Sequence, residues 1–233
     1  FQLPDSSIAV CARNQPSEYD TLTSFGREPH WSPVEDRIAF RSEDGLYVVD
    51  PHTKDVTLVR AGGENQTPAW SPDGTEIVVG EEDRLMAISY PDGQPEAIPC
   101  AEPDLAPCDG EHPTYSPDGA WVAFEDGHEI FKVARDGGTA EIAVDDLGDV
   151  MSPAWSPDGE FIAFSRHSEF EGWEIWVIDA DGVDAGLWQL TSSEEYQDLY
   201  PTWTPDSRAI VFDSTRGPVP ERNLWVIGFD PDR

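Results

Sequence analysis

Basic residues are scarce in this chain, and their scarcity limits the partners that it can bind. The 233 residues include 47 Asp and Glu but only 14 Lys and Arg, so the formal net charge is −33. Nucleic acids and anionic membrane surfaces are bound through positively charged surfaces, so the sequence predicts neither as a partner. A carboxylate excess with only two lysines, Lys54 and Lys132, is typical of proteins from salt-loving organisms and also of ordinary acidic secreted proteins.

Long hydrophobic runs and catalytic motifs are also missing from the sequence. No apolar stretch approaches the ~18 residues that a membrane-spanning helix needs, so we expect no membrane insertion. The chain has no Gly-x-Ser-x-Gly elbow, no His-Glu-x-x-His and no Gly-rich phosphate loop, and its five histidines are scattered along the chain. The sequence therefore predicts no catalytic residues, no metal ion and no cofactor, which is typical of a non-enzymatic protein.

Cysteine is rare too, and the three cysteines cannot all pair with one another. Cys100 and Cys108 flank a proline-rich stretch of seven residues without a strand pattern, where a disulfide would fasten the loop. Cys11 follows an apolar segment and is expected to be a small buried residue. A disulfide between Cys100 and Cys108 would place the protein in an oxidising compartment.

Against these absences stands a repeat that covers most of the chain. Five copies of Pro-x-aromatic-Ser/Thr-Pro follow one another at steps of 39, 45, 40 and 48 residues. In each copy a turn comes next, Pro-Asp-Gly in three of the five, followed by two short β-branched and aromatic segments and then a weaker one. Four short strands per repeat, with no helical period, predict blades of four antiparallel strands. The five repeat prolines are Pro29, Pro68, Pro113, Pro153 and Pro201.

The pattern Pro-x-Trp-Ser-Pro-Asp-Gly, followed by Ile-Ala-Phe and Ile-Trp-Val, resembles the blade repeat of TolB-like β-propellers. It also resembles the propeller domains of prolyl-oligopeptidase-like and tricorn-like peptidases. The likeness runs from about Ile8 to Phe229, with local departures such as Asp36 and Ser207 in place of the turn glycine. It implies a single all-β propeller domain over residues 1–233 that is periplasmic or extracellular and binds protein or peptide partners.

The number of strands decides how such a propeller would close. The pattern predicts two strands before the first repeat, sixteen in the four complete repeats and three in the last, or twenty-one in all. This is one more than five blades need and three fewer than six. We therefore expect five blades, with the strand Tyr19–Thr23 beside the last strand, Leu224–Phe229, so that the two ends of the chain close the ring. A six-bladed ring with trimmed ends is the alternative, because six is the usual count in TolB-like proteins.

The position of the long insertions predicts where a binding site lies. They fall on the loops between second and third strands and between blades, and function tends to lie on variable loops that a rigid scaffold holds. On that side, the residues before each repeat proline and the residues that end second strands are expected to surround a channel mouth. The predicted site consists of Glu28, Arg41, Thr67, His112, Glu125, Ser152, Tyr200 and Asp213.

These observations favour a monomeric, non-enzymatic binding platform for a protein or peptide outside the cytoplasm. The Pro-Asp-Gly turns on the opposite side are expected to take no part in binding. Three alternatives follow from the same sequence. The chain would otherwise be the propeller domain of a larger peptidase, or a propeller glycosidase or lyase that uses channel carboxylates, or a propeller whose channel holds only water.

Overall fold

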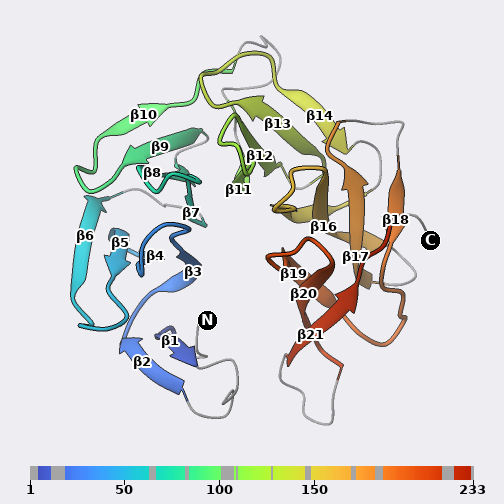
Figure 1. Ribbon diagram of the computed structural model, residues 1–233, viewed down its shortest axis with the longest axis horizontal. Helices are drawn as coiled ribbons and strands as arrows, with labels where there is room; N and C mark the ends of the chain where they lie inside the picture. Colours follow the sequence, from blue (N-terminus) through green and yellow to red (C-terminus); the bar gives the residue numbers. More distant parts are fainter. Residues whose placement is uncertain are drawn as a thin grey trace. The chain divides into compact units, whose positions relative to one another are not determined.

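The computed structural model consists of β-strands and turns, as the sequence predicts (Figure 1). Its described part contains twenty-one strands, the number expected from the repeats, and no helix. Within that part, no helix is long and apolar enough to cross a bilayer. The structure describes residues 5–11, 19–62, 67–81, 84–100, 108, 110–126, 128–144, 148–168, 172–181, 186–216 and 223–231.

The chain divides into two compact units. The first comprises residues 1–99 and 105–109, and the second comprises residues 100–104 and 110–233. The predicted single domain therefore stays a prediction. Closure of a ring by the first and last strands also stays a prediction, because these strands belong to different units.

The first unit contains a strand pair and two four-stranded antiparallel blades, in which neighbouring strands follow the order of the sequence. The pair is β1 (Ile8–Cys11) with β2 (Tyr19–Thr23). The first blade consists of β3 (Arg27–Trp31), β4 (Ile38–Ser42), β5 (Gly45–Val49) and β6 (Val56–Ala61). The second blade consists of β7 (Ala69–Trp70), β8 (Glu76–Gly80), β9 (Leu85–Ser89) and β10 (Pro95–Ala97).

The second unit contains the other three blades. The third blade consists of β11 (Glu111–Tyr115), β12 (Trp121–Glu125), β13 (Ile130–Ala134) and β14 (Glu141–Val144). The fourth consists of β15 (Val150–Trp155), β16 (Phe161–Ser168), β17 (Gly172–Asp179) and β18 (Leu187–Gln189). The fifth has three described strands, β19 (Asp198–Trp203), β20 (Ala209–Ser214) and β21 (Asn223–Gly228). Each repeat thus forms one antiparallel blade, which confirms the predicted blade architecture.

Apolar side chains on the middle strands hold each blade together. In β12 and β13, Val122 lies opposite Val133 and Phe124 lies opposite Phe131. The two Phe rings stack with their centroids 5.6 Å apart, and all four side chains are buried. Burial of side chains of this size stabilises the fold by about 1.5–3 kcal/mol each. The β-branched and aromatic segments of the repeat therefore form strands because their side chains make the core.

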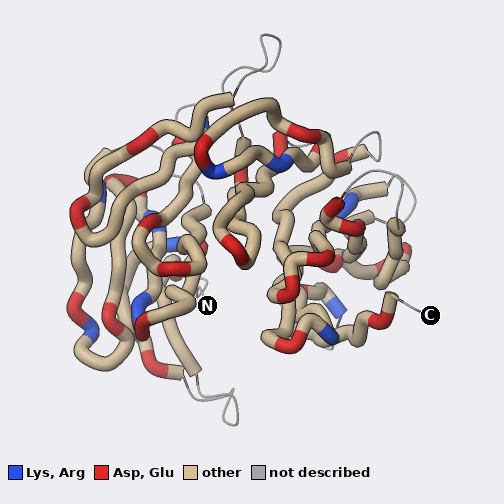
Figure 2. The backbone as a smooth tube through the Cα atoms, turned by 45° about the horizontal axis from the view of Figure 1, so that its top comes forward, with Lys and Arg blue, Asp and Glu red and all other residues tan. Residues whose placement is uncertain are grey.

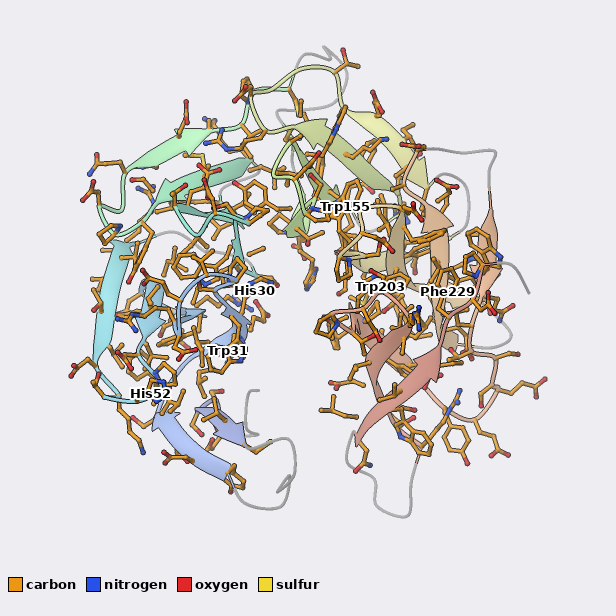
Figure 3. All side chains as sticks on the ribbon, viewed as in Figure 1. His30, Trp31, His52, Trp155, Trp203 and Phe229 are labelled. Carbon is orange, nitrogen blue, oxygen red and sulfur yellow. The ribbon has the colours of Figure 1, made fainter. Side chains whose placement is uncertain are left out.

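In the second and fifth blades, the tryptophan of the repeat joins its blade to the blade before it. Trp70 Nε1 donates a hydrogen bond to the carbonyl of His30 at 3.2 Å, and Trp203 Nε1 donates to the carbonyl of Ala154 at 3.0 Å. Trp203 also packs edge-on against Phe229, with ring centroids 5.4 Å apart (Figure 3). Trp70 and Trp203 are therefore packing residues of the scaffold, whereas Trp31 is exposed.

The aspartate of the Pro-Asp-Gly turn stabilises the turn that contains it. Asp118 Oδ1 accepts hydrogen bonds from the Ser116 hydroxyl at 2.6 Å and from the Ala120 N–H at 3.0 Å. Asp73 and Asp206 accept the corresponding bonds in their own turns. The bond from the Ser or Thr hydroxyl lowers the pKa of all three carboxyl groups. The aspartate thus stabilises the conformation of its own turn in these blades.

The cysteines are paired as predicted, but one is placed differently. Cys100 and Cys108 are disulfide-bonded, which confirms the bridge, and Cys11 is the free cysteine. The prediction that Cys11 is buried is wrong. Ile8 and Ala9 at the start of β1 are buried, whereas Cys11 is the last residue of the strand and is exposed, because the strand has left the core by then.

Acidic residues lie along the turns and loops of both units (Figure 2). Most are solvated, but four of the described acidic residues are buried, and so is one lysine. Buried charges are destabilising unless they are paired and hydrogen-bonded. The fold must therefore supply ion-pair or hydrogen-bond partners to these five residues. They are Glu81, Glu125, Glu174, Asp198 and Lys132.

Candidate functional site

The residue before the repeat proline lies in a β-bulge. In four blades the pairing of the first and second strands shifts at this point, so that one extra residue is inserted on the first strand. The residue directly before the proline then has a positive φ, between 47° and 56°. A bulge redirects a side chain, and its repetition with four different residues makes it a property of the blade. These residues are Glu28, His112, Ser152 and Tyr200.

In the first unit, three predicted site residues meet in one hydrogen-bonded cluster. Arg41 contacts Glu28 through two atom pairs, Nε to Oε2 at 2.5 Å and Nη2 to Oε1 at 2.9 Å. The Thr67 hydroxyl donates to Glu28 Oε2 at 3.1 Å. Both charged side chains are partly exposed, and each neutralises the other. The cluster joins the first blade to the second, because Thr67 directly precedes the second repeat proline.

In the second unit, Glu125 is the centre of a buried cluster at the end of β12. Its side chain is only 4% exposed. Oε1 lies 3.1 Å from His112 Nδ1, and Oε2 accepts a hydrogen bond from the Ser152 N–H at 2.8 Å. Glu125 thus satisfies the backbone of the bulge in the next blade and holds the imidazole of the bulge in its own blade.

Tyr200 also lies in a bulge whose backbone N–H is bound by the preceding blade, and its side chain is exposed to solvent. Its N–H donates to the hydroxyl of buried Ser165 at 3.1 Å, so a residue of the second strand of one blade again binds the bulge of the next. Tyr200 as a whole remains 47% exposed. The centroid of its ring lies 6.4 Å from that of His112, and the two rings are tilted by 46°. The arrangement places an aromatic surface on a backbone that cannot easily move.

The eight predicted site residues therefore form two groups. Glu28, Arg41 and Thr67 are together in the first unit. The second unit holds the other five, of which Asp213 lies in β20 opposite Leu199, the residue before Tyr200. A shared channel mouth for all eight residues stays a prediction, because the two groups belong to different units. The eight are Glu28, Arg41, Thr67, His112, Glu125, Ser152, Tyr200 and Asp213.

Sequence reasoning missed two residues of the second group. Ser165 lies within β16, the second strand of the fourth blade, at the register position that Glu125 has in the third blade. Aligning the second strands of all blades would have found it. Glu111 lies directly opposite Glu125 in the ladder between β11 and β12. No local pattern marks Glu111, because in a regular strand it would point away from its neighbour His112.

A second buried charge network, also unforeseen, lies beside the loops of the fourth and fifth blades. Asp198 accepts a hydrogen bond from Ser214 and pairs with Arg216 at 2.5 Å. Glu174 accepts hydrogen bonds from the Thr191 hydroxyl at 2.5 Å and the Ser193 N–H at 2.6 Å. Burial raises the pKa of Glu174, although these bonds act in the opposite direction. The network organises the loops on which long insertions occur.

Comparison with known proteins gives one curated relative and several structures of the same fold. No family model matches the chain. An uncharacterised protein of Agrobacterium fabrum is 30% identical over 172 residues, which cover 71% of this chain and 55% of the relative. The chain thus spans about half the length of that relative.

The structural neighbours include two TolB proteins. A putative TolB from Agrobacterium tumefaciens is 26% identical, with a TM-score of 0.63, over 76% of this chain and 62% of that chain. TolB from Acinetobacter baumannii is 18% identical, with a TM-score of 0.76, over 95% of this chain and 57% of that chain. An oligogalacturonate lyase in complex with manganese shares the fold at 17% identity and a TM-score of 0.59, over 92% and 80% of the two chains. The chain thus has a β-propeller fold that is similar to the fold of the TolB proteins.

Proposed function

We propose that this chain is a non-enzymatic binding domain that holds a protein or peptide outside the cytoplasm. The observation that carries the proposal is Tyr200. Its ring is exposed, while the bulge and the bond from its N–H to Ser165 fix its backbone. Rigid aromatic side chains contribute much of the free energy of protein association, because little conformational freedom is lost when they are covered.

The surroundings of Tyr200 suit a peptide that is neutral or basic. His112 lies beside the tyrosine ring, and Asp213 lies in the strand next to its bulge. The chain as a whole carries a net charge of −33. Such a field slows the approach of acidic partners and accelerates the approach of basic ones. We therefore expect the partner surface to offer an apolar pocket for Tyr200 and a positive or neutral rim.

A location outside the cytoplasm is supported by the covalent structure. Cys100 and Cys108 are disulfide-bonded, and disulfides form and persist mainly in oxidising compartments. The likeness to TolB proteins is consistent with such a location. A mass measurement after alkylation without reductant checks this part, since freshly purified protein should then carry one alkyl group, on Cys11.

Binding is tested with partners captured from the native extract in high salt and then titrated one by one. Tyr200→Ala and His112→Ala should each weaken binding by more than about 1 kcal/mol, or about fivefold. Two exposed residues serve as controls that should leave affinity unchanged, Tyr19→Ala on β2 and Glu160→Ala beside a Pro-Asp-Gly turn. Loss of binding in the Glu160 variant with normal binding in the Tyr200 variant would move the site to the turns.

A further inference from the structure

We propose that Glu111, His112 and Glu125 form a binding site for a divalent first-row transition-metal ion of the Zn²⁺ kind. One ligand atom from each residue lies within 4.8 Å of the other two. Among the described residues, this is the one group of three or more His, Cys, Asp or Glu side chains that are this close together. The ligands come from two adjacent strands of the third blade, β11 and β12.

The bulge is what brings Glu111 and His112 to the same place. Successive side chains of a regular strand point to opposite faces of the sheet, so neighbours rarely bind one ion. His112 has a φ of 47°, and the pairing of β11 with β12 shifts just beyond Glu111. This change of backbone direction places the imidazole beside Glu125, the cross-strand partner of Glu111.

The first blade shows the same geometry with the charges reversed. Arg27 lies opposite Arg41 in its ladder, and Glu28 from the bulge binds Arg41. In the third blade two carboxylates, Glu111 and Glu125, lie opposite each other, with an imidazole in the bulge. Like charges directly opposite in a ladder are destabilising. A cation among these ligands would neutralise the two carboxylates, just as the Glu28 carboxylate neutralises Arg41.

The distances require only small changes to admit an ion. Zn²⁺ binds His nitrogen and carboxylate oxygen at about 2.0–2.2 Å, so the ligand atoms of a tetrahedral site are about 3.4 Å apart. His112 Nδ1 and Glu125 Oε1 are already 3.1 Å apart. Glu111 is exposed and its flexible side chain can adjust. Two ligands are therefore nearly in place, and the third can close on the ion.

The groups behind the ligands fit the same assignment. Glu125 Oε2 accepts the Ser152 N–H at 2.8 Å, which orients the carboxylate and leaves Oε1 directed to the cluster. The Ser152 side chain is 8% exposed, and its hydroxyl oxygen has no hydrogen-bond partner in the described structure. A water molecule on a bound ion would supply the partner that this buried hydroxyl lacks.

The donor set selects the class of ion. Mg²⁺ and Ca²⁺ prefer sites made of oxygen ligands only, whereas imidazole favours Zn²⁺ and its neighbours in the first transition row. Two carboxylates and a neutral imidazole carry a charge of −2, which balances a divalent ion. Three protein ligands leave a fourth position open.

The test is a titration of the chelator-treated protein with Zn²⁺, followed by calorimetry, and with Co²⁺, followed by visible absorption. We expect one ion per chain. Glu111→Gln and His112→Gln should each weaken Zn²⁺ affinity at least about tenfold. The matched control is His52→Gln (His52 is labelled in Figure 3), because His52 Nε2 lies 3.0 Å from Asp36 Oδ2 in an exposed pair that no third described His, Cys, Asp or Glu side chain completes to a metal-binding group. The Zn²⁺ affinity of this control variant should stay within about twofold of that of the parent protein.

Three results would overturn the site. They are the absence of stoichiometric binding, an affinity unchanged in both ligand variants, and displacement of Zn²⁺ by an equal concentration of Ca²⁺ or Mg²⁺. The first two would leave His112 and Glu125 as a simple ion pair. The melting temperature of each metal-free variant shows whether it is folded. The titration uses no protein or peptide partner, so it can succeed where the proposed binding function fails, and the reverse.

Discussion

Carboxylate side chains have different surroundings at the two ends of the blades. At the turn end, which carries the Pro-Asp-Gly turns, aspartates such as Asp73, Asp118 and Asp206 are solvated and make the same local hydrogen bonds. At the bulge end, which carries the residues before the repeat prolines, Glu125 is buried and binds residues from two blades. The turn end repeats because it shapes the chain locally, whereas the bulge end varies because each blade places a different side chain on the same backbone.

This contrast separates scaffold from candidate site. Asp118, for example, bonds to groups two residues away on either side, so these bonds stabilise its own turn and do not depend on the neighbouring blade. A bulge residue meets residues 13 to 39 positions away in the sequence. Its identity can therefore be changed without changing the turn, which is what a variable binding surface on a fixed scaffold requires.

The largest expected difference between the two ends is in stability. Glu125→Ala leaves the buried Ser152 N–H without its acceptor and His112 without its partner, and should lower the free energy of unfolding by about 2–4 kcal/mol. Asp118→Ala removes solvated turn bonds and should cost about 1 kcal/mol or less. Urea denaturation in the presence of a chelator measures both. A greater loss in the Asp118 variant would reverse the comparison.

A smaller effect is expected from salt, which acts mainly on the exposed carboxylates. The Debye length falls from about 10 Å at 0.1 M to about 3 Å at 1 M, so repulsion among solvated charges weakens while buried pairs are little affected. The melting temperature should rise by about 2–4 °C over this range. Glu35→Gln combined with Glu160→Gln should reduce the rise, because it removes two exposed charges near the turn end. A flat melting temperature would show that the net charge of −33 does not destabilise the fold.

The smallest expected effect is a difference in pH dependence: a buried carboxylate, Glu174, and a solvated one, Asp118, should change the stability of the fold in different ways as pH changes. The pKa of Glu174 is raised by burial above its ordinary 4.5, so the native state holds this proton more tightly and the contribution of Glu174 to stability falls as pH rises through that window. The pKa of Asp118 is lowered below its ordinary 3.8 by the bond from Ser116, so its contribution is present above that value and is lost on acidification.

Matched amide variants test these opposite signs. Relative to the parent, Glu174→Gln should gain stability as pH rises above about 4.5, whereas Asp118→Asn should lose less stability as pH falls below about 4. Denaturation curves between pH 3 and 8, about one pH unit apart, provide the comparison. Parallel pH profiles for the two variants would contradict the assigned shifts.

Much of the fold could be predicted because its causes are local. Turn residues and short apolar segments predicted the number of strands, twenty-one, and their grouping into blades, whereas the bulges before the repeat prolines were not predicted. The burial of Cys11 was predicted wrongly, because an apolar segment does not show where its strand leaves the core. Ser165 and Glu111 were missed because their roles depend on a neighbouring blade or on the direction of a bulged strand.

The sequence by itself thus determined the repeat, the strands, the turns, the disulfide and the strongly acidic charge. These features depend on residues that are neighbours in the chain, or on composition alone. Only the tertiary structure decided that Tyr200 is exposed on a fixed backbone and that Glu111, His112 and Glu125 converge. The physical reason is that a left-handed bulge residue turns its side chain away from the strand alternation, and that pairing between strands and blades brings distant residues to it.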